Sequence, residues 1–192
     1  MTRFLNQPKI VSKKKLLFHV CCAPCSGLLS QELIKEYDLA VYFDNPNIWP
    51  KEEFDKRSEE AGRYFVNQGI KFVFVDWDHD SWLGVARDFD QEPERGRRCK
   101  LCYHLRLENA AKYAASHKFD CFVTSLSISP HKDDKTIRNL GRALAKKYGL
   151  TYLDFDFKAS PGYAAALLFA KDQRFYRQKY CGCEYSLKNG KI

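Results

Sequence analysis

No apolar run in this sequence approaches the roughly 20 residues that a membrane-spanning helix requires. The longest one near its end, residues 163–170, is far too short. A secretory leader is not expected either, because His19 and the cysteines and proline after it interrupt the apolar segment 16–18, and no small-x-small cleavage site follows. We therefore expect a cytoplasmic protein without a membrane partner.

Cysteine is too scarce for a small disulfide scaffold, because eight cysteines in 192 residues fall well below the ~8–10% of such domains. A chain of this length also buries enough surface to fold without cross-links. Clustered thiols in a reducing compartment more often hold a metal or carry out redox chemistry. The cysteines stand at positions 21, 22, 25, 99, 102, 121, 181 and 183.

The composition excludes a disordered chain, since 45% of the residues are hydrophobic and 15% are aromatic. Lys and Arg outnumber Asp and Glu by 32 to 24, which gives a formal net charge of +8 at pH 7. This excess favours an anionic partner, with nucleic acid as the leading candidate.

Short apolar segments alternate along the chain with segments of helical spacing, a pattern typical of a parallel sheet covered on both faces. We therefore expect a single three-layer, Rossmann-like α/β domain with a mainly parallel sheet. The sequence predicts strands at residues 16–20, 39–43, 71–75, 119–125 and 151–155. It predicts helices at residues 26–37, 52–67, 101–117 and 133–148, and a loop from 76 to about 98.

The domain organisation follows from the same pattern, because no internal repeat or interdomain linker interrupts it. Residues 1–15 are polar and basic, which predicts a loose N-terminal arm. Residues 16–192 form one α/β domain that binds a metallocluster, in agreement with the usual size of single domains. Beyond residue 160 the periodicity weakens, and we expect a C-terminal extension that folds over the site.

Ligands of open α/β sheets bind beyond the carboxyl ends of the strands. The segments that follow the predicted strands contain thiol and polar residues that would share this edge. His131 is a better functional candidate than His19, because His131 lies at this edge whereas His19 falls inside a strand. Asp44 and Asp133 have the alternative interpretation of turn or helix-cap residues. The segments at this edge are 21–25, 44–47, 76–78 and 127–132.

Two cysteine motifs indicate a metal centre. Cys21, Cys22 and Cys25 lie where a strand gives way to a helix, whose N-terminus favours the thiolate that binds metals. Cys99 and Cys102 are one helical turn apart and can hold one centre. Their distance along the chain from the first motif excludes a local zinc knuckle. A [4Fe-4S] cluster accepts sulfur ligands from separated segments, and zinc at a nonlocal four-thiolate site stays open as the alternative.

The Cys181-Gly182-Cys183 element is of a different kind. Two thiols that flank one glycine can close a very small disulfide ring, and glycine relieves its backbone strain. Small strained disulfides tend to be reducible, hence catalytic or regulatory. The alternatives are unlinked thiols or additional metal ligands. Cys121, on a predicted strand, is expected to be a buried core residue.

Two basic runs adjoin cysteines. Residues 95–98 precede Cys99, and residues 171–180 interleave cations with aromatic rings directly before Cys181. This combination suits phosphate contact together with base stacking, although a solvated basic surface is the simpler alternative. The candidate RNA contacts are Arg97, Arg98, Arg174 and Arg177.

These motifs together resemble the QueH family of epoxyqueuosine reductases over residues 19–186. The resemblance implies a cobalamin-independent oxidoreductase that converts epoxyqueuosine in tRNA to queuosine, with a four-iron cluster and an adjacent metal. The matching segments are HVCCAPCS at 19–26, YFDNPNI at 42–48, the CxxC motif at 99–102, TSLSISPHKD at 124–133 and YRQKYCGCEYS at 176–186.

Position by position, the resemblance implies that the [4Fe-4S] ligands are Cys21, Cys22, Cys99 and Cys102. Cys181 and Cys183 would form a redox-active disulfide. Cys25 would replace one of the four ligands or help to hold the second metal ion, an iron, with Asp44 or His131. Asp44, His131 or a bound water would deliver the proton. The implied partners are the anticodon arm of a tRNA, held by its phosphates, and an unidentified external electron donor.

The implied chemistry agrees with the residues present. Conversion of an epoxide to an alkene takes two electrons and two protons and releases water. Zinc has no electrons to give, whereas an iron–sulfur cluster passes them singly and a dithiol stores two. A second metal would act as a Lewis acid on the epoxide oxygen.

Two other functions stay open as alternatives. An ATP-pyrophosphatase-type tRNA-modifying enzyme would need a glycine-rich phosphate loop after the first strand, where this sequence has Cys-Cys-Ala-Pro-Cys. A noncatalytic zinc-bearing RNA-binding module would leave the Cys-Gly-Cys element without a role.

Overall fold

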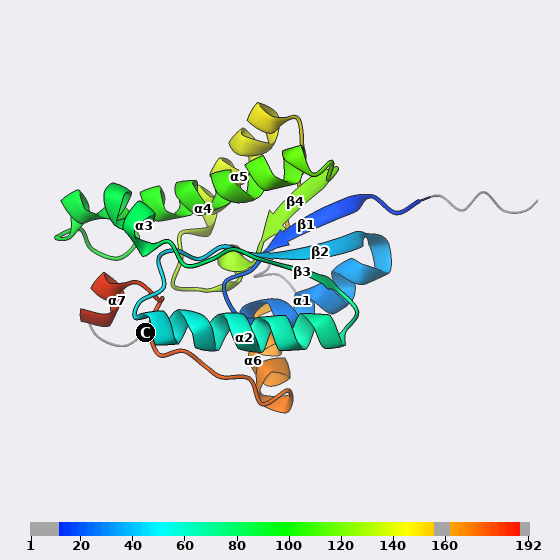
Figure 1. The fold of residues 1–192 in the computed structure, drawn as a ribbon, viewed down its shortest axis with the longest axis horizontal. Helices are drawn as coiled ribbons and strands as arrows, with labels where there is room; N and C mark the ends of the chain where they lie inside the picture. Colours follow the sequence, from blue (N-terminus) through cyan, green and yellow to red (C-terminus); the bar gives the residue numbers. More distant parts are fainter. Residues whose placement is uncertain (1–11, 156–161, 189–192) are drawn as a thin grey trace, which may run out of the picture.

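The computed structural model of the chain describes residues 12–155 and 162–188. At its centre is a sheet of five strands in the order β3-β2-β1-β4-β5, and every neighbouring pair runs parallel. The expected α/β class is therefore confirmed (Figure 1). The strands are β1 (Lys15–His19), β2 (Asp38–Phe43), β3 (Lys71–Phe74), β4 (Cys121–Thr124) and β5 (Thr151–Tyr152).

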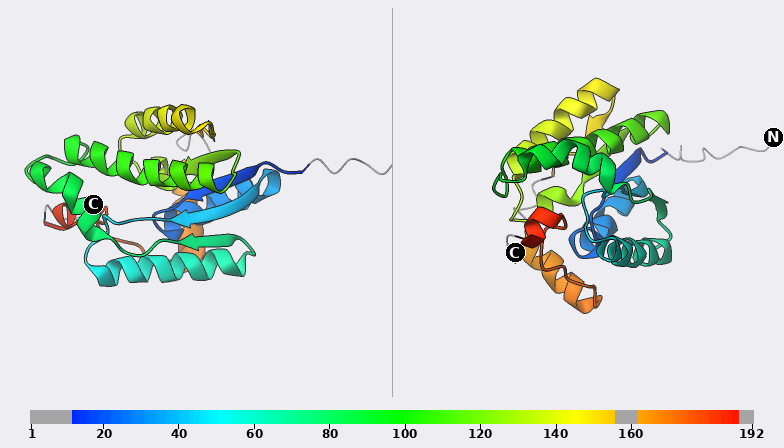
Figure 2. Two further views of the ribbon diagram at one scale, coloured as in Figure 1. Left: turned by 45° about the horizontal axis from the view of Figure 1, so that its top comes forward. Right: turned by 60° about the vertical axis from the view of Figure 1, so that its left-hand side comes forward.

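Helices cover both faces of the sheet, which gives the three layers that the sequence predicts. Figure 2 shows α4 and α5 on one side of the sheet and α1, α2 and α6 on the other. Two short 3-10 turns, Arg87–Phe89 and Ser125–Ile128, follow α3 and β4. The helices are α1 (Ala23–Glu36), α2 (Lys51–Asn67), α3 (His79–Ala86), α4 (Arg97–Ser116), α5 (Asp134–Tyr148), α6 (Gly162–Asp172) and α7 (Glu184–Lys188).

Alternate residues of the central strand pack into two different cores. Leu17 of β1 packs with side chains of α4 and α5, whereas Leu16 and Phe18 pack with side chains of α1 and α2. All three side chains are fully buried. Burial on both faces is the reason that this strand has a continuous apolar sequence.

The loop predicted for residues 76–98 is wrong, because this segment contains α3. Asp78 caps that helix by accepting a hydrogen bond from the backbone N–H of Ser81 at 3.1 Å. The side chains of Trp82 and Ala86 on this helix are buried. A helix of eight residues is marginal by itself and depends on such packing, so the local sequence pattern did not reveal it.

The helix predicted from residue 101 begins at Arg97 instead. Cys99 and Cys102 consequently lie within the first two turns of α4, where their backbone is already helical. The strand predicted for residues 151–155 is limited to Thr151–Tyr152 at the edge of the sheet.

The C-terminal extension returns across the molecule to the carboxyl ends of the strands. α6 packs against α1 at Gly27, where an added Cβ would lie 2.8 Å from the ring of Phe169 and 3.1 Å from that of Phe175. Residues 173–183, called here the C-terminal strap, then reach the loop after β2. There the backbone N–H of Trp49 donates to the carbonyl of Gly182 at 2.8 Å.

The two ends of the chain lie partly outside the described residues. Of the arm predicted for residues 1–15, residues 1–11 are not described, and Lys15 belongs to β1. No helix in the described part of the chain is both long enough and apolar enough to cross a membrane.

Candidate metal and redox site

Three thiols meet at the point where β1 gives way to α1. The Sγ atoms of Cys21, Cys22 and Cys25, called here the thiol trio, all lie within 4.8 Å of one another. Cys21 and Cys22 follow β1, and Cys25 lies in the first turn of α1. Ser125, which follows β4, donates from Oγ to the Cys21 Sγ atom at 3.8 Å. The trio therefore lies between β1 and β4, where the strand order of the sheet reverses.

The hydrogen bonds within the trio distribute its protons unequally. Bonds from Cys22 and Cys25 hold the pKa of Cys21 well below its usual range. The same bonds raise the pKa of Cys22 to about 12 and that of Cys25 well above the ordinary thiol value. Cys21 is therefore the preferred thiolate, and a thiolate is the form of cysteine that binds metals.

A second group of thiols begins with Cys99 and Cys102 on α4. The backbone N–H of Arg95 donates to Cys99 Sγ at 3.3 Å. Burial raises the pKa of Cys99 to about 11, and charge interactions with the neighbouring Cys102 and Cys181 add to that rise. Cys102 and Cys183 belong to one buried cluster. The α4 motif and the C-terminal cysteines, although far apart in sequence, thus lie side by side.

The C-terminal thiol pair, Cys181 and Cys183, consists of free thiols in this structure. Gly182 between them has φ 130°, a conformation that residues with a side chain rarely adopt. The backbone N–H of Cys181 donates to Ser186 Oγ at 3.1 Å, and the N–H of Ser186 donates to Cys183 Sγ at 3.4 Å. These bonds fix both residues of the pair without a covalent link.

Three buried cations adjoin the thiols, and the sequence analysis did not identify any of them as a site residue. Arg57 is 2% exposed, Arg106 2% and Lys132 9%. Arg57 donates from Nη1 to the carbonyl of Cys181 at 3.3 Å. Arg106 donates to Asn45 Oδ1, and its charge lowers the pKa of the neighbouring Cys102 against the effect of burial.

Lys132 links the two thiol groups electrostatically. Burial lowers its pKa, but charge interactions with Cys181, Cys21 and Cys25 outweigh that effect and raise the pKa above its ordinary value. One cation therefore faces both the trio and the C-terminal pair. The sequence offered one signal for Arg106, which stands four residues after Cys102 on the same helix face. Lys132 follows His131 in a segment already placed at the sheet edge.

The predicted acid–base candidates differ in their surroundings. Asp44 is 4% exposed and accepts hydrogen bonds from Tyr42 Oη at 3.3 Å and Asn109 Nδ2 at 2.9 Å. Burial raises the pKa of Asp44. His131 is exposed, and its backbone carbonyl accepts a hydrogen bond from Arg95. Asp44 is therefore buried near Arg106, whereas His131 lies on the surface loop after β4.

Two residues outside the site match the core roles expected for them. His19 is fully buried, with Nδ1 2.8 Å from Thr124 Oγ1 and Nε2 3.2 Å from the carbonyl of Asp44. Burial lowers its pKa to about 3, so the ring is neutral. Cys121 is 1% exposed on β4, which confirms it as a core residue.

The four candidate RNA contacts are not equivalent. Arg97, Arg174 and Arg177 are exposed. Arg98 is only 1% exposed, and its Nη1 donates to the carbonyls of Phe89 and Asp90, both at 2.9 Å. Its guanidinium closes the turn between α3 and α4 and has no surface to offer a phosphate.

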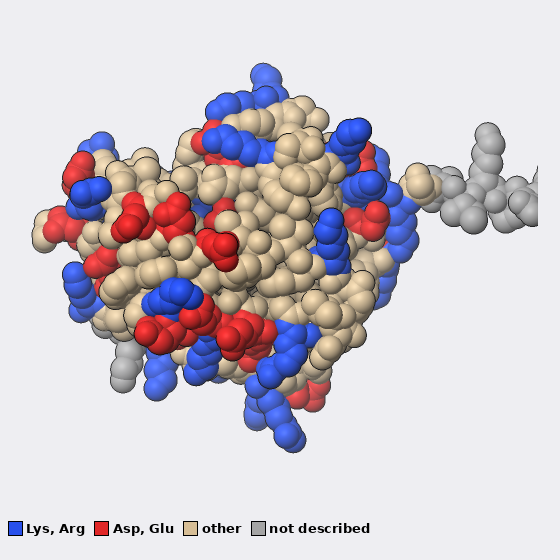
Figure 3. Space-filling view, in the orientation of Figure 1, with Lys and Arg blue, Asp and Glu red and all other residues tan. Residues whose placement is uncertain are grey.

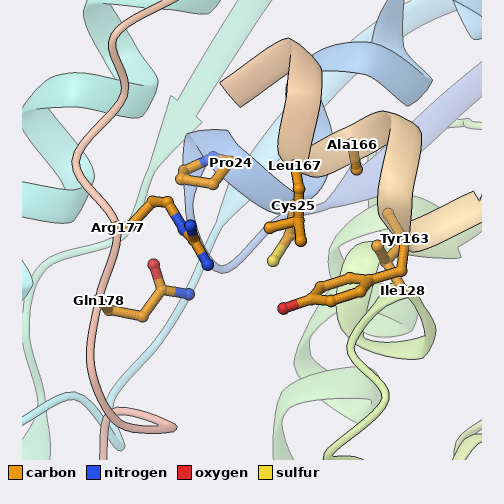
Figure 4. A pocket seen from close by; sticks show the side chains of 8 residues that line it. All are labelled: Pro24, Cys25, Ile128, Tyr163, Ala166, Leu167, Arg177 and Gln178. Carbon is orange, nitrogen blue, oxygen red and sulfur yellow. The ribbon is translucent and has the colours of Figure 1, made fainter. Parts of the chain in front are cut away.

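A pocket of about 60 Å³ opens above the trio. Figure 4 shows the sulfur of Cys25 directed into it between Tyr163 of α6 and the Arg177 and Gln178 side chains of the C-terminal strap. Gln178 Nε2 lies 3.3 Å from Cys22 Sγ. A small group entering here would meet a thiol, a phenol, an amide and a guanidinium.

The arrangement fits a sulfur-ligated metal centre. In the described ranges, the trio is the one group of three potential ligand atoms that lie within 4.8 Å of one another, which suits a single ion. Cys99 of α4 packs against the same buried cluster of side chains as Cys21 and Cys22. Fold and site together define an α/β oxidoreductase with a thiol-lined centre at the switch point of its sheet.

Comparison with known proteins gives the family. A family model described as epoxyqueuosine reductase QueH matches residues 16–189. An epoxyqueuosine reductase QueH from Haemophilus influenzae is 41% identical over 177 residues, which are 91% of this chain and 72% of the relative. That of Acinetobacter baylyi is 38% identical over 96% of this chain and 88% of its own length. The chain belongs to the QueH family of epoxyqueuosine reductases.

A more distant similarity concerns the fold alone. A crystal structure described as a predicted subunit of tRNA methyltransferase from Methanocaldococcus jannaschii superimposes with a TM-score of 0.55 at 15% identity. The match covers 82% of this chain and 76% of that one. The family assignment favours the reductase over both alternatives considered from the sequence.

Proposed function

We propose that this protein reduces epoxyqueuosine in tRNA to queuosine at a centre built from its clustered thiols. The observation that carries this proposal is the convergence of the trio, the α4 motif and the C-terminal pair at one edge of the sheet. Every cysteine except Cys121 belongs to one of these three segments. Family membership supplies the reaction, and the geometry supports the assignment of residues proposed below.

The proposed ligands of a [4Fe-4S] cluster are Cys21, Cys22, Cys99 and Cys102. Such a cluster, when bound, supplies or accepts single electrons at low potential. Cys25 lies within the trio and joins the metal ligands, either at the cluster or at an adjacent iron. The all-sulfur donor set and the burial of the trio support iron–sulfur ligation over a hydrolytic zinc site.

The buried cations make this concentration of thiolates possible. Several negative sulfur atoms in one poorly solvated volume repel one another strongly. Arg57, Arg106 and Lys132 offset that repulsion from three different elements. Lys132 also lies near both the trio and the C-terminal pair. Its positive charge would stabilise a negative charge on the oxygen that leaves the substrate there.

The C-terminal pair is proposed as the two-electron reductant. Oxidation of two thiols to a disulfide releases two electrons and two protons, which are the amounts needed to turn an epoxide into an alkene and water. Asp44 is the proposed internal proton reservoir, since burial raises its pKa. His131 stays a second candidate on the surface loop. An external electron donor must reduce the disulfide before the next turnover.

The proposed tRNA contacts are Arg97, Arg174 and Arg177. Exposed cations of this kind bind phosphates and orient the RNA without reading its sequence. Arg98 is omitted from this set because its guanidinium is buried against backbone carbonyls.

Anaerobic purification followed by iron analysis and a multiple-turnover assay tests the proposal. We expect a brown protein with about four or more irons per chain that converts epoxyqueuosine-containing tRNA when a chemical reductant is supplied. Cys99→Ala should lose both iron and turnover. Cys121→Ala, which removes a buried thiol far from the trio, should keep both. A colourless zinc protein, or full iron content in Cys99→Ala, would contradict the ligand assignment.

The variant Cys183→Ser, studied in the same assay, distinguishes the contribution of the C-terminal pair from that of the cluster. The variant should keep its iron and its visible spectrum, because Cys183 is not among the proposed cluster ligands. Multiple turnover should be lost, since a serine cannot form the disulfide. Retained multiple turnover would remove the disulfide from the reaction but leave the cluster in place.

A further inference from the structure

A second hollow lies directly outside the pocket above Cys25. It runs along the exposed side of α6 and the beginning of the C-terminal strap and is called here the α6 groove. Leu168 at its rim is 71% exposed. The groove is lined by Leu167, Leu168, Lys171, Arg174, Phe175 and Arg177, among others.

The α6 groove and the thiol pocket share a wall. Leu167 and Arg177 line both of them. In Figure 4 the Arg177 guanidinium extends from the strap toward Cys25, while Leu167 projects from α6 on the other side. A chain lying in the groove can therefore place one group into the pocket, with Arg177 at the boundary between the two.

Three cations of this groove are exposed, namely Lys171, Arg174 and Arg177. Among the described residues, none accepts a hydrogen bond or forms an ion pair with the side chain of Lys171, Arg174 or Arg177. Some exposed cations elsewhere are paired, such as Lys51 with Asp55 at 2.6 Å and Lys147 with Glu108 at 2.7 Å. Three unpaired charges around an apolar floor are complementary to an anionic chain that carries flat apolar groups.

A comparable hollow near α3 lacks this complementarity. It is lined by aromatic rings but also by Glu52, Asp78 and Asp80, with Lys51 as its one lysine or arginine. Figure 3 shows acidic side chains gathered over α2 and toward α3. These carboxylates would repel a polyanion. The α6 groove therefore differs from this hollow in its charge, which favours it as the binding site of an anionic chain.

Tight packing holds the groove in shape. Gly27 lets Phe169 and Phe175 approach α1 closely, and a larger residue there would collide with both rings. Arg174 adopts φ 55°, and the next N–H, that of Phe175, donates to the carbonyl of Ala170 at 2.9 Å. This turn reverses the chain after α6 and sends the strap, with Arg177, back over the pocket.

We propose that the α6 groove binds the single-stranded RNA segment that flanks the reacting nucleoside. Arg177 contacts the phosphate next to that nucleoside, and Lys171 and Arg174 contact phosphates farther out. Leu167 and Leu168 pack against a ribose or base face. This assignment rests on the proposed function and adds to it the path by which the substrate reaches Cys25.

The test compares tRNA binding by two double variants of equal charge. K171Q/R174Q removes two unpaired cations from the groove, and K35Q/K112Q removes two exposed lysines from α1 and α4 that pair with Glu32 and Glu108. Fluorescence anisotropy with unmodified tRNA at several salt concentrations gives the affinity and its salt slope. We expect K171Q/R174Q to bind at least about tenfold more weakly, with the slope reduced by ~0.7 for each lost contact. The control should bind like the wild type.

Equal weakening in both double variants would overturn the proposal, because it would show general charge attraction only. An unchanged slope in K171Q/R174Q would also overturn it. Turnover by R177Q and R177K tests the proposed contact of Arg177 with the phosphate next to the reacting nucleoside. R177K should retain more activity than R177Q because it keeps the positive charge. If the wild type binds tRNA through the groove but does not reduce epoxyqueuosine, the proposed function fails and the groove assignment stands.

Discussion

The trio and the C-terminal pair are both thiol clusters at the same edge of the sheet, yet they are held in different ways. The trio comes from five consecutive positions, and its geometry follows from the end of β1 and the first turn of α1. The C-terminal pair lies in an extended strap with no strand or helix of its own. Its position depends on side chains from distant elements.

The contacts around the strap show how this is achieved. Arg57 of α2 pairs with Glu53 at 2.7 Å and donates to the carbonyls of Tyr180 and Cys181. Glu53 also accepts a hydrogen bond from Tyr176 Oη at 2.9 Å. A few side chains of α2 thus fix the last turn before the pair. The sheet therefore builds the part of the site proposed to hold metal, whereas side chains of other elements attach the part proposed to act as reductant.

Arg57→Met should have the largest effect on the strap. The side chains of Arg57 and Glu53 are only 1% and 10% exposed, so the substitution leaves a buried carboxylate without its partner. We expect a loss of about 3–5 kcal/mol in the free energy of unfolding, measured by urea denaturation. Arg63→Met, an exposed arginine on the same helix, should change it by no more than about 0.5 kcal/mol.

The double variant E53Q/R57M checks the cause. It removes the charge that Arg57→Met leaves unpaired, so part of the lost stability should return. If the double variant is as unstable as the sum of the single ones, the ion pair is not what holds the strap, and the contrast between the two halves weakens.

Gly182→Ala should lower the free energy of unfolding less than Arg57→Met does, and it should lower turnover without a loss of iron. An alanine at φ 130° is strained by about 1–3 kcal/mol, and its Cβ would lie 3.1 Å from Arg57 Nη1. The resulting shift of the C-terminal pair should lower turnover at least about tenfold, while iron content stays constant.

The matched control is Gly84→Ala in α3, where an added Cβ meets nothing within 4 Å. It should stabilise the protein by about 0.5–1 kcal/mol and leave turnover unchanged. Normal turnover in Gly182→Ala would mean that the pair tolerates displacement, and the reducing half would then need no rigid attachment.

Glu108→Gln should have the smallest effect, because Glu108 lies near the middle of α4, beyond the turns that contain Cys99 and Cys102. Hydrogen bonds from Lys147 and Tyr148 lower the pKa of Glu108 to about 2. Its stabilising contribution is therefore complete above the ordinary value of 4.5 and is lost as the pH falls toward 2.

Unfolding measurements of wild type and variant at several pH values check this expectation. The wild type should be more stable by up to about 1 kcal/mol at pH 7, and the two curves should converge near pH 2. A constant difference across this range would show that Glu108 acts through packing and not through its charge.

Sequence patterns sufficed where a structural feature is local. The alternation of apolar segments predicted the parallel sheet, and the segment after the first strand identified the trio's cysteines. The Asp133 side chain caps the start of α5, and Gly149 ends the helix in a left-handed conformation. Asp and Gly are the residue types typical of these two positions, so the sequence predicted both ends of the helix. The core position of Cys121 followed from its place in a strand.

The same patterns failed where contacts decide the outcome. α3 is stabilised by the burial of Trp82 against the C-terminal residues, and no local signal in residues 76–98 indicates that packing. Arg98 has the sequence surroundings of an RNA contact, but it is buried against carbonyls of the preceding turn. The roles of Arg106 and Lys132 beside the thiols did not follow from their place in the sequence, because a cation becomes part of a thiol site only when the fold turns it inward.

By itself, the sequence determined the type and order of the main elements and the family resemblance, because periodicity and motif spacing are properties of neighbouring residues. Only the tertiary structure decided that α3 exists, that three buried cations surround the thiols and that the α6 groove opens onto Cys25. These features depend on which distant side chains share a small volume. Burial and electrostatic energies in that volume are set by three-dimensional distance and not by separation along the chain.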